Sequence, residues 1–282
     1  MTAFTNHKAR ESFEVRILRQ DQPRLASYWE SFRIKYEPGL NITSVLQKIA
    51  ADPVTISGRE VTPVAYEANC LENMCGSCTM LIDGRVRQAC TALVDHILAE
   101  GREFIELRPM SKFPVVRDLV VGRGRLFRAL EKLHCWIEVD GYMDRGPGAP
   151  QSPAEQQQAY TLSTCFSCGC CLEACPQYVK VDITPEPGES GEQYSARERA
   201  NFDSHFIGAA AMSQGVLMNS NPIGRMTAPK RLEALTAPGG IQECGKAGNC
   251  QAVCPKLIPL MTSWGRVGRA ATLYSLKKLF GG

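Results

Sequence analysis

Apolar and polar residues near the beginning of the chain follow strand-like patterns. Residues 13–18 favour a strand, and residues 32–36 alternate apolar with polar side chains, as a half-buried strand does. The polar connection between them suits a hairpin. After it, Asn41 or Thr43 is expected to cap a short helix. The apolar residues that this helix would turn inward are Val45, Leu46 and Ile49.

A second predicted hairpin follows further along the chain. Residues 80–82 and 85–87 flank Asp83 and Gly84, and an Asp-Gly pair supplies the positive φ angles of a tight two-residue turn. Residues 103–107 give a last strand, and the strand-rich part of the chain ends near Arg108 and Pro109. Strands around one helix describe a small mixed-sheet domain, which we place over residues 13–115, after a flexible N-terminus of residues 1–12.

The pattern then becomes helical. Residues 116–133 and residues 230–235 have apolar positions at helical spacing. We therefore expect a second, all-α domain over residues 116–282, and an α+β fold class for the chain. Residues 181–205 are rich in Pro, Gly, Ser and Glu and almost lack apolar residues, which predicts a polar insertion in loop form without chemistry of its own.

Composition adds little except for the cysteines. A chain of 282 residues with 44% hydrophobic content buries a real core, and 32 basic against 29 acidic residues indicate no nucleic-acid partner. The polar N-terminus lacks an export signal, and no segment has the roughly 18 to 20 apolar residues of a spanning helix. We expect a cytoplasmic protein that touches a membrane only through a partner or a surface helix, and 13 thiols that are not disulfides.

The first cysteine set has the ligand spacing of plant-type 2Fe-2S proteins. Its members follow the pattern C-x4-C-x2-C, with a fourth Cys after eleven intervening residues. They are Cys70, Cys75, Cys78 and Cys90. Gly76 permits a tight turn in this loop, and the predicted Asp-Gly hairpin returns the chain to it. Zinc is the alternative, but zinc thiols usually come as two C-x2-C pairs.

Two further runs share one motif. The first, C-x2-C-x2-C-x3-C-P, is the run of bacterial ferredoxins, and consists of Cys165, Cys168, Cys171 and Cys175 before Pro176. The second consists of Cys244, Cys250 and Cys254 before Pro255, and has Ala247 in the place of a second Cys. In two-cluster ferredoxins the fourth Cys of a run binds the other cluster.

Crossing the fourth cysteines gives two different ligand sets. A 4Fe-4S cluster is assigned Cys165, Cys168, Cys171 and Cys254. The other set is Cys175, Cys244 and Cys250, with Ala247 at a vacant cluster corner. Because an iron without a thiolate is held weakly, this set predicts a 3Fe-4S cluster.

The remaining cysteines and the histidines are assigned no ligand role. Cys170 is interpreted as a bystander packed beside a cluster, and Cys135 as a buried apolar residue rather than part of a catalytic pair with His134. The four histidines are too scattered for a Rieske centre: His7, His96, His134 and His205.

The order of these three cysteine sets resembles the iron-sulfur subunit of succinate:quinone and quinol:fumarate oxidoreductases. The resemblance covers nearly the whole chain, including residues 113–119 at the join and Cys254-Pro255-Lys256 near the end. It implies a β-grasp ferredoxin domain followed by an α-helical ferredoxin domain. It also implies that electrons pass between a flavoprotein subunit, whose covalent FAD exchanges hydride with succinate or fumarate, and a membrane quinone. No catalytic residue is then expected in this chain.

Two positions depart from the pattern of ubiquinone-linked members of this family. Many of those members have a His directly after the first Cys of the last run, where this chain has Gly245. They also have a Trp shortly after the Cys-Pro of the previous run, where this chain has Lys180. A quinone contact from this subunit is therefore expected only at Pro176. The chain is more similar to members with menaquinone and a single-chain anchor that carries two haems b, on the cytoplasmic face of the inner membrane.

The end of the chain is basic. From Cys244 onward there is no Asp or Glu, and the basic residues are Lys246, Lys256, Arg266, Arg269, Lys277 and Lys278. This tail either faces anionic headgroups or an acidic anchor, or is a solvated helix face. The residues expected to pack inward are Val267, Leu273, Leu276 and Phe280.

Three alternatives stay open from the residues alone. The same subunit can serve fumarate reduction by quinol, since both directions use this wiring. The nearest rival interpretation is an electron-transfer subunit of another flavin enzyme, such as a heterodisulfide-reductase-like complex. A zinc-stapled protein would use the same thiols without colour.

Overall fold

The computed structural model describes residues 11–137, 150–181 and 183–280. The chain divides into two compact units, Met1–Gly122 and Arg123–Gly282. The predicted boundary after residue 115 lies before this division, because residues 115–121 form a hairpin in the first unit. Most of the predicted flexible N-terminus lies outside the described residues, and Ser12 already begins a strand.

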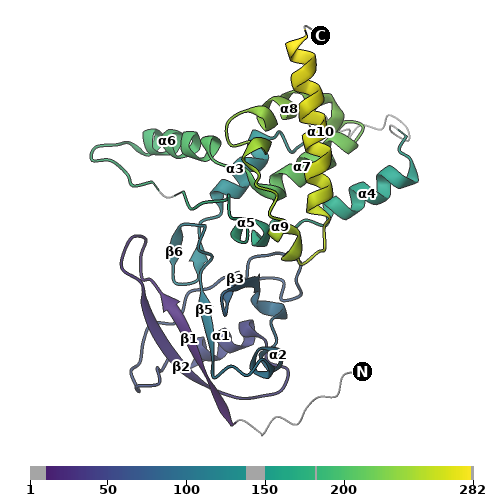
Figure 1. Ribbon diagram of the computed structural model, residues 1–282. Coiled ribbons are helices and arrows are strands. Elements are labelled where there is room, and N and C mark those ends of the chain that lie inside the picture. The colour runs from purple at the N-terminus through teal and green to yellow at the C-terminus, as the bar shows by residue number, and fades with distance from the viewer. Residues whose placement is uncertain (1–10, 138–149, 182, 281–282) are drawn as a thin grey trace, which may run out of the picture. The chain divides into compact units, whose positions relative to one another are not determined.

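The first unit is built on a five-stranded mixed sheet (Figure 1). Its strands are β1 (Ser12–Arg19), β2 (Tyr28–Lys35), β3 (Thr79–Ile82), β4 (Arg85–Gln88) and β5 (Phe104–Arg108), in the order β2-β1-β5-β3-β4. The central pair β1 and β5 is parallel, and the other pairs are antiparallel. Both predicted hairpins are confirmed, and β2 begins four residues earlier than residue 32.

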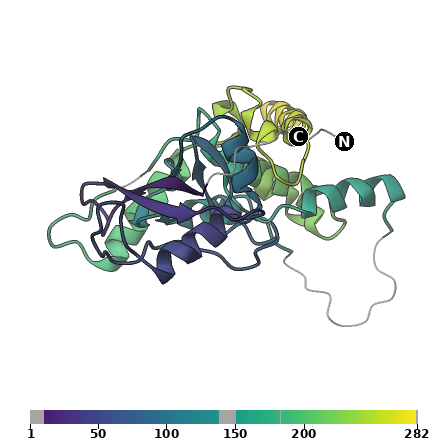
Figure 2. The same ribbon diagram turned by 90° about the horizontal axis from the view of Figure 1, so that it is seen from below.

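Helix α1 (Ile42–Ala51) lies along one face of this sheet (Figure 2). Asn41 is its N-cap, and the Asn41 side chain accepts a hydrogen bond of 2.9 Å from the Ser44 N–H. The predicted inward residues Val45, Leu46 and Ile49 are buried in the main hydrophobic cluster. Helix α2 (Val94–Ala99) and the short 3-10 helix η1 (Ala89–Thr91) also belong to this unit and were not predicted.

The predicted helix over residues 116–133 is wrong in its first part. Strands β6 (Val115–Arg117) and β7 (Val120–Val121) form a hairpin there, and α3 (Gly124–Lys132) begins only after it. Asp118 has a φ of 45°, and its carboxylate accepts hydrogen bonds from the N–H groups of Gln20 and Ala65. These contacts within the first unit override the local helical pattern.

The second unit is helical, as predicted. Its longer helices besides α3 are α4 (Pro153–Ser163), α6 (Gly191–Ser204), α7 (Gly208–Ser220), α8 (Ala228–Thr236) and α10 (Leu260–Leu279). The short elements are α5 (Cys170–Glu173), η2 (Gly224–Thr227), η3 (Ile241–Glu243) and α9 (Asn249–Ala252). Helix α7 is buried along most of its length and packs against α3, α4, α5, α8 and α10. Helix α8 confirms the helix predicted over residues 230–235.

The segment predicted as a loop contains helix α6. Ser190 and Gln193 form a reciprocal capping box at its start, which satisfies N–H groups that a loop would leave to water. None of its residues is buried, so the sequence has no periodic apolar pattern here from which a helix could be predicted. Asp203 near its end pairs with Arg128 of α3 at 2.6 Å.

Helix α10 ends the described chain and buries only part of its length (Figure 1). Val267 is buried as predicted, but the other three expected inward residues are exposed: Leu273 by 51%, Leu276 by 45% and Phe280 by 81%. The second half of α10 has too few neighbours to cover them. Within the described residues, no helix combines the length and apolar character needed to cross a membrane.

Candidate iron-sulfur sites

Residues 70–76 of the first unit fold into a loop that surrounds cysteine sulfurs with N–H groups. The Cys70 Sγ accepts hydrogen bonds of 3.2 Å from the N–H groups of Met74 and Cys75, and the Cys70 N–H donates to the Cys75 Sγ at 3.5 Å. Three residues of the loop have positive φ: Leu71, Asn73 and Gly76. These turns point the amides inward, as sulfur that carries negative charge requires.

The other two predicted ligands of this site lie at the open end of the β3–β4 hairpin. Cys78 directly precedes β3, and Cys90 lies in η1 directly after β4. The Ala89 N–H donates to the Cys78 backbone oxygen at 3.1 Å, and both cysteines are buried. Burial and the neighbouring Cys90 raise the pKa of Cys78 to about 11.

Cys75 differs from Cys78 in its charge state. Partial burial raises the pKa of Cys75, but hydrogen bonds from the Ser77 hydroxyl and from the backbone N–H groups of Cys70 and Ser77 outweigh it. The net pKa is about 6. The loop therefore stabilises a thiolate, which is the form that binds iron.

The two cysteine runs of the second unit have the same backbone. In each run, two residues have positive φ: the one two positions after the first Cys, and the one four positions after the first Cys. The angles are 54° at Ser167 and 57° at Lys246, and 86° at Gly169 and 76° at Gly248. A four-residue helix follows each glycine, α5 in the first run and α9 in the second. Ala247 therefore occupies the backbone position that Cys168 has in the first run.

Each of two cavities takes cysteines from both runs. One cavity, of about 380 Å³ including its open mouth, is lined by Cys165, Cys168, Cys171 and Cys254, the four residues predicted to share a cluster. Ile258 and Leu260 contribute apolar wall to it. We call this the four-cysteine cavity.

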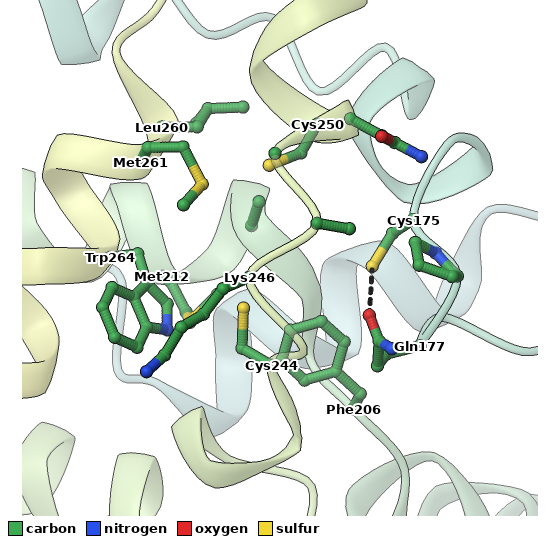
Figure 3. Close-up of a pocket in the computed structure, with 15 residues that line it drawn as sticks. Cys175, Gln177, Phe206, Met212, Cys244, Lys246, Cys250, Leu260, Met261 and Trp264 are labelled. Atoms are coloured by element: carbon green, nitrogen blue, oxygen red, sulfur yellow. Dashed lines mark hydrogen bonds between the residues drawn. The ribbon is translucent and has the colours of Figure 1, made fainter.

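The second cavity is lined by Cys175, Cys244 and Cys250, together with Ala247 (Figure 3). Its volume is about 390 Å³ including its open mouth. We call this the three-cysteine cavity. Each cavity is thus lined by one of the two cysteine sets that result from exchanging the fourth cysteines of the runs. Pro176 lines the second cavity as well.

Two residues that no sequence motif assigned to this site lie beside these cysteines. Trp264, from α10, and Lys246 line the three-cysteine cavity, and the Lys246 Nζ lies 4.6 Å from the centre of the Trp264 ring. No motif connects these residues in the sequence. Only the return of α10 to the loop that carries Lys246 places them together.

The thiols of the second unit fit a buried iron-sulfur cluster. They come from separate segments and surround hollows with apolar walls, and soft thiolates are the ligands that iron-sulfur clusters take. Within the described part of the chain, no three His, Cys, Asp or Glu side chains are grouped as ligands of one metal ion. Burial raises the pKa of Cys171 well above its ordinary value. A hydrogen bond with Cys170, predicted as a bystander, lowers the pKa of Cys168 to about 7.

Three other residues singled out in the sequence lie as follows. Cys135 is half-buried, its Sγ is 3.9 Å from the Leu133 backbone oxygen, and burial raises its pKa to about 12. A Cβ at Gly245 would come within 2.5 Å of the Gln177 Nε2, so Gln177 fills the space that a side chain at position 245 would enter. His7 lies outside the described residues.

Comparison with known proteins gives matches over both units. The model for a 2Fe-2S iron-sulfur cluster binding domain matches residues 14–128, and the model for a 4Fe-4S dicluster domain matches residues 161–258. The succinate dehydrogenase iron-sulfur subunit of Bacillus subtilis is 43% identical, over 94% of this chain and 94% of its own length. The fumarate reductase iron-sulfur subunit of Wolinella succinogenes is 26% identical, over 88% of this chain and 92% of its own.

A solved structure supports the fold. A chain of the Mycobacterium smegmatis Sdh1 complex in the apo form aligns with a TM-score of 0.67 at 18% identity, over 93% of this chain and 97% of that one. The α+β class is confirmed, and the cluster-domain matches favour iron-sulfur chemistry over zinc. On this combined basis, the chain belongs to the iron-sulfur subunits of the succinate dehydrogenase and fumarate reductase family, and its role is electron transfer.

Proposed function

We propose that this chain carries electrons between an FAD-containing flavoprotein subunit and a membrane quinone. Its clusters would follow the order 2Fe-2S, 4Fe-4S and 3Fe-4S. The observation that carries the proposal is the crossing of the two runs, which surrounds one cavity with four cysteines and the other with three and Ala247. Two centres that share a wall of packed protein are suited to one-electron transfer rather than to binding a metabolite.

The 2Fe-2S cluster would be held by two pairs of cysteines. Cys70 and Cys75 exchange hydrogen bonds with each other, and Cys78 and Cys90 interact with each other. Two thiolates on each of two irons satisfy the four ligands of this cluster type. When bound, the cluster supplies one-electron redox chemistry, and the loop amides stabilise its negative charge.

The clusters of the second unit would be held by the crossed sets. Cys165, Cys168, Cys171 and Cys254 suit a 4Fe-4S cluster. Cys175, Cys244 and Cys250 suit a 3Fe-4S cluster, since a methyl group at Ala247 offers iron no ligand at the fourth corner.

The flavoprotein would dock on the loop of the first unit. Leu71 and Met74 lie between Cys70 and Cys75 in this loop and are exposed by 52% and 56%. Large apolar side chains next to a redox centre are buried at little cost by a partner surface, and they exclude water from the contact. The dicarboxylate site would lie on that partner, so this chain contributes no catalytic residue.

The membrane side would be the end of the second unit, on the cytoplasmic face of the inner membrane. Exposed Leu276 and Phe280 accompany Lys277 and Lys278 on the free half of α10. Apolar and basic side chains together suit anionic headgroups or an acidic anchor. We propose a haem b anchor and menaquinone, because Gly245 and Lys180 replace the His and Trp of ubiquinone-linked members. Reversing the charge of Lys277 and Lys278 should release the complex from membranes at lower salt; unchanged attachment would make this a solvated helix face.

One experiment tests the proposed function as a whole. The complex is purified from membranes, its quinone is identified, and its low-temperature EPR spectra are recorded at fixed potentials. We expect three distinct spin systems, at least two of which are reduced by succinate. A colourless protein, or a single cluster type, would contradict the proposal.

A further inference from the structure

The three-cysteine cavity contains a hydrogen-bond donor that the protein itself leaves unused. The indole Nε1 of Trp264 is buried and has no hydrogen-bond partner among the described residues. An indole nitrogen can only donate, and leaving such a donor unpaired in a protein interior is unfavourable, because the donor has lost its hydrogen bond to water. The nitrogen edge of the ring faces the side of the cavity where Lys246 and Cys244 lie (Figure 3). An acceptor is therefore expected within the contents of this cavity.

Lys246 holds this ring from the loop that carries the cysteines. It lies between Cys244 and Ala247, and its backbone has a φ of 57°, an angle that L residues other than Asn or Asp seldom adopt. In this conformation its ammonium lies over the indole face, 4.6 Å from the ring centre. One wall of the cavity thus combines an N–H donor and a positive charge.

The four-cysteine cavity supplies a natural comparison. There, too, a lysine lies over an aromatic ring, with the Lys256 Nζ 5.3 Å from the centre of the Phe166 ring. Both residues line that cavity. A phenyl ring has no N–H group, so the two cavities share the cation but differ in the donor.

We propose that Trp264 is a positioning residue for electron transfer, which donates its Nε1–H to a sulfur atom of the cluster in the three-cysteine cavity. Lys246 fixes the ring and adds positive charge. This inference rests on the proposed function, which places a 3Fe-4S cluster there. Taking up an electron makes the cluster sulfurs more negative, and a donor and a cation favour that state. Trp264 and Lys246 therefore raise the reduction potential of this cluster.

The test is a redox titration of the purified complex, followed by the EPR signal of the oxidised 3Fe-4S cluster. Trp264→Phe keeps the ring and removes the N–H. We expect the same spin count but about a tenfold shift of the one-electron equilibrium toward the oxidised state, which is about 59 mV to lower potential. Lys246→Gln should shift the potential in the same direction. Lys246→Arg, which keeps the charge, should restore it.

Trp136→Phe is the matched control, because the Trp136 ring packs at a tilt against His134 and does not line the cavity. A second measurement needs no variant. Electron-nuclear double resonance of the unsubstituted complex should show that the proton on the Trp264 Nε1 is coupled to the cluster. Labelling tryptophan with 15N should identify the nitrogen that carries this proton. Absence of this coupling, or an unchanged potential in Trp264→Phe, overturns the inference. So does a variant that changes only the KM for quinone, since the indole would then serve the quinone. If the unsubstituted complex lacks the 3Fe signal altogether, the proposed function is what fails.

Discussion

Arg19 and Asp118 form a buried, two-point ion pair in the first unit. The Arg19 Nε donates to Oδ1 of Asp118 at 3.1 Å and the Arg19 Nη2 donates to Oδ2 at 3.0 Å, across 99 positions of sequence. The exposed fractions of the two side chains are 1% and 0%. Arg19 Nη1 also donates to Glu30 at 2.7 Å. The pair joins the end of β1 to the β6–β7 hairpin, in the segment that the sequence had indicated as helix.

We expect Asp118→Asn to lower the free energy of unfolding by about 3–5 kcal/mol, because it leaves the Arg19 charge buried with one partner fewer. Urea unfolding of the chain, followed by the loss of the EPR signal of the 2Fe-2S cluster proposed for its first unit, measures the effect. Glu14→Gln is the control. The Glu14–Arg16 pair is partly exposed, with side-chain exposures of 24% and 42%, and its loss should cost at most about 1 kcal/mol. Equal effects of both variants would contradict the prediction.

The crossing of the cysteine runs predicts which cluster each cysteine supports. Cys254→Ser should remove or alter the 4Fe-4S EPR signal and leave the 3Fe-4S signal, although Cys254 belongs to the second run. Cys175→Ser should do the reverse. The physical reason is that each residue lines the cavity of the other run. If each variant lost the cluster of its own run, the crossed assignment would be wrong.

Ala247 is predicted to determine the cluster type in its cavity. Ala247→Cys adds a thiolate where the first run has Cys168, and we expect the EPR signal of the oxidised 3Fe cluster to disappear in favour of a 4Fe-4S cluster. Iron and sulfide analysis should show one iron more per chain. Ala247→Val supplies bulk without a ligand and should keep the 3Fe signal. A persistent 3Fe signal in the Cys variant would mean that Ala247 does not occupy the vacant corner of the cluster.

Two glycines in the second unit are expected to respond to Ala substitution with opposite signs. A Cβ at Gly240 would lie 2.1 Å from the Leu235 backbone oxygen, so Gly240→Ala should destabilise the unit by about 1–3 kcal/mol. Gly265 lies inside α10 with open space around it, and Gly265→Ala should stabilise the unit by about 0.5–1 kcal/mol. Differential scanning calorimetry measures both; a stabilising Gly240→Ala would refute the close approach.

Cys135 is predicted to resist alkylation in the folded protein. Burial raises its pKa to about 12 from an ordinary value of 9.0, so the reactive thiolate is about a thousandfold rarer below pH 9. Because the folded state binds the proton more tightly, this group lowers stability as pH rises above 9.0 toward 12. Iodoacetamide labelling of the Cys135 peptide, read by mass spectrometry, should be slow in the native protein and fast in urea. Similar rates in both would contradict burial of the thiol.

The sequence predicted the fold class correctly, and its cysteine spacing predicted an assignment of ligands to clusters that the variants above test. Alternation identified both main hairpins, and the offsets of the two runs identified Ala247 as the counterpart of Cys168. It failed where distant contacts outweigh local pattern. The hairpin around Asp118 depends on partners such as Arg19, and helix α6 depends on its cap and ion pairs rather than on an apolar face.

The spacing of the thiols by itself determined the chemistry of this protein, because a cluster needs ligands of one type at fixed separations along a tight loop. Only the tertiary structure decided what surrounds that chemistry. The contact of Trp264 with Lys246 arises from the packing of α10 on the second unit, and no periodicity in the sequence encodes it. The same packing leaves Leu273, Leu276 and Phe280 exposed, since the free half of α10 extends past the helices that could cover it.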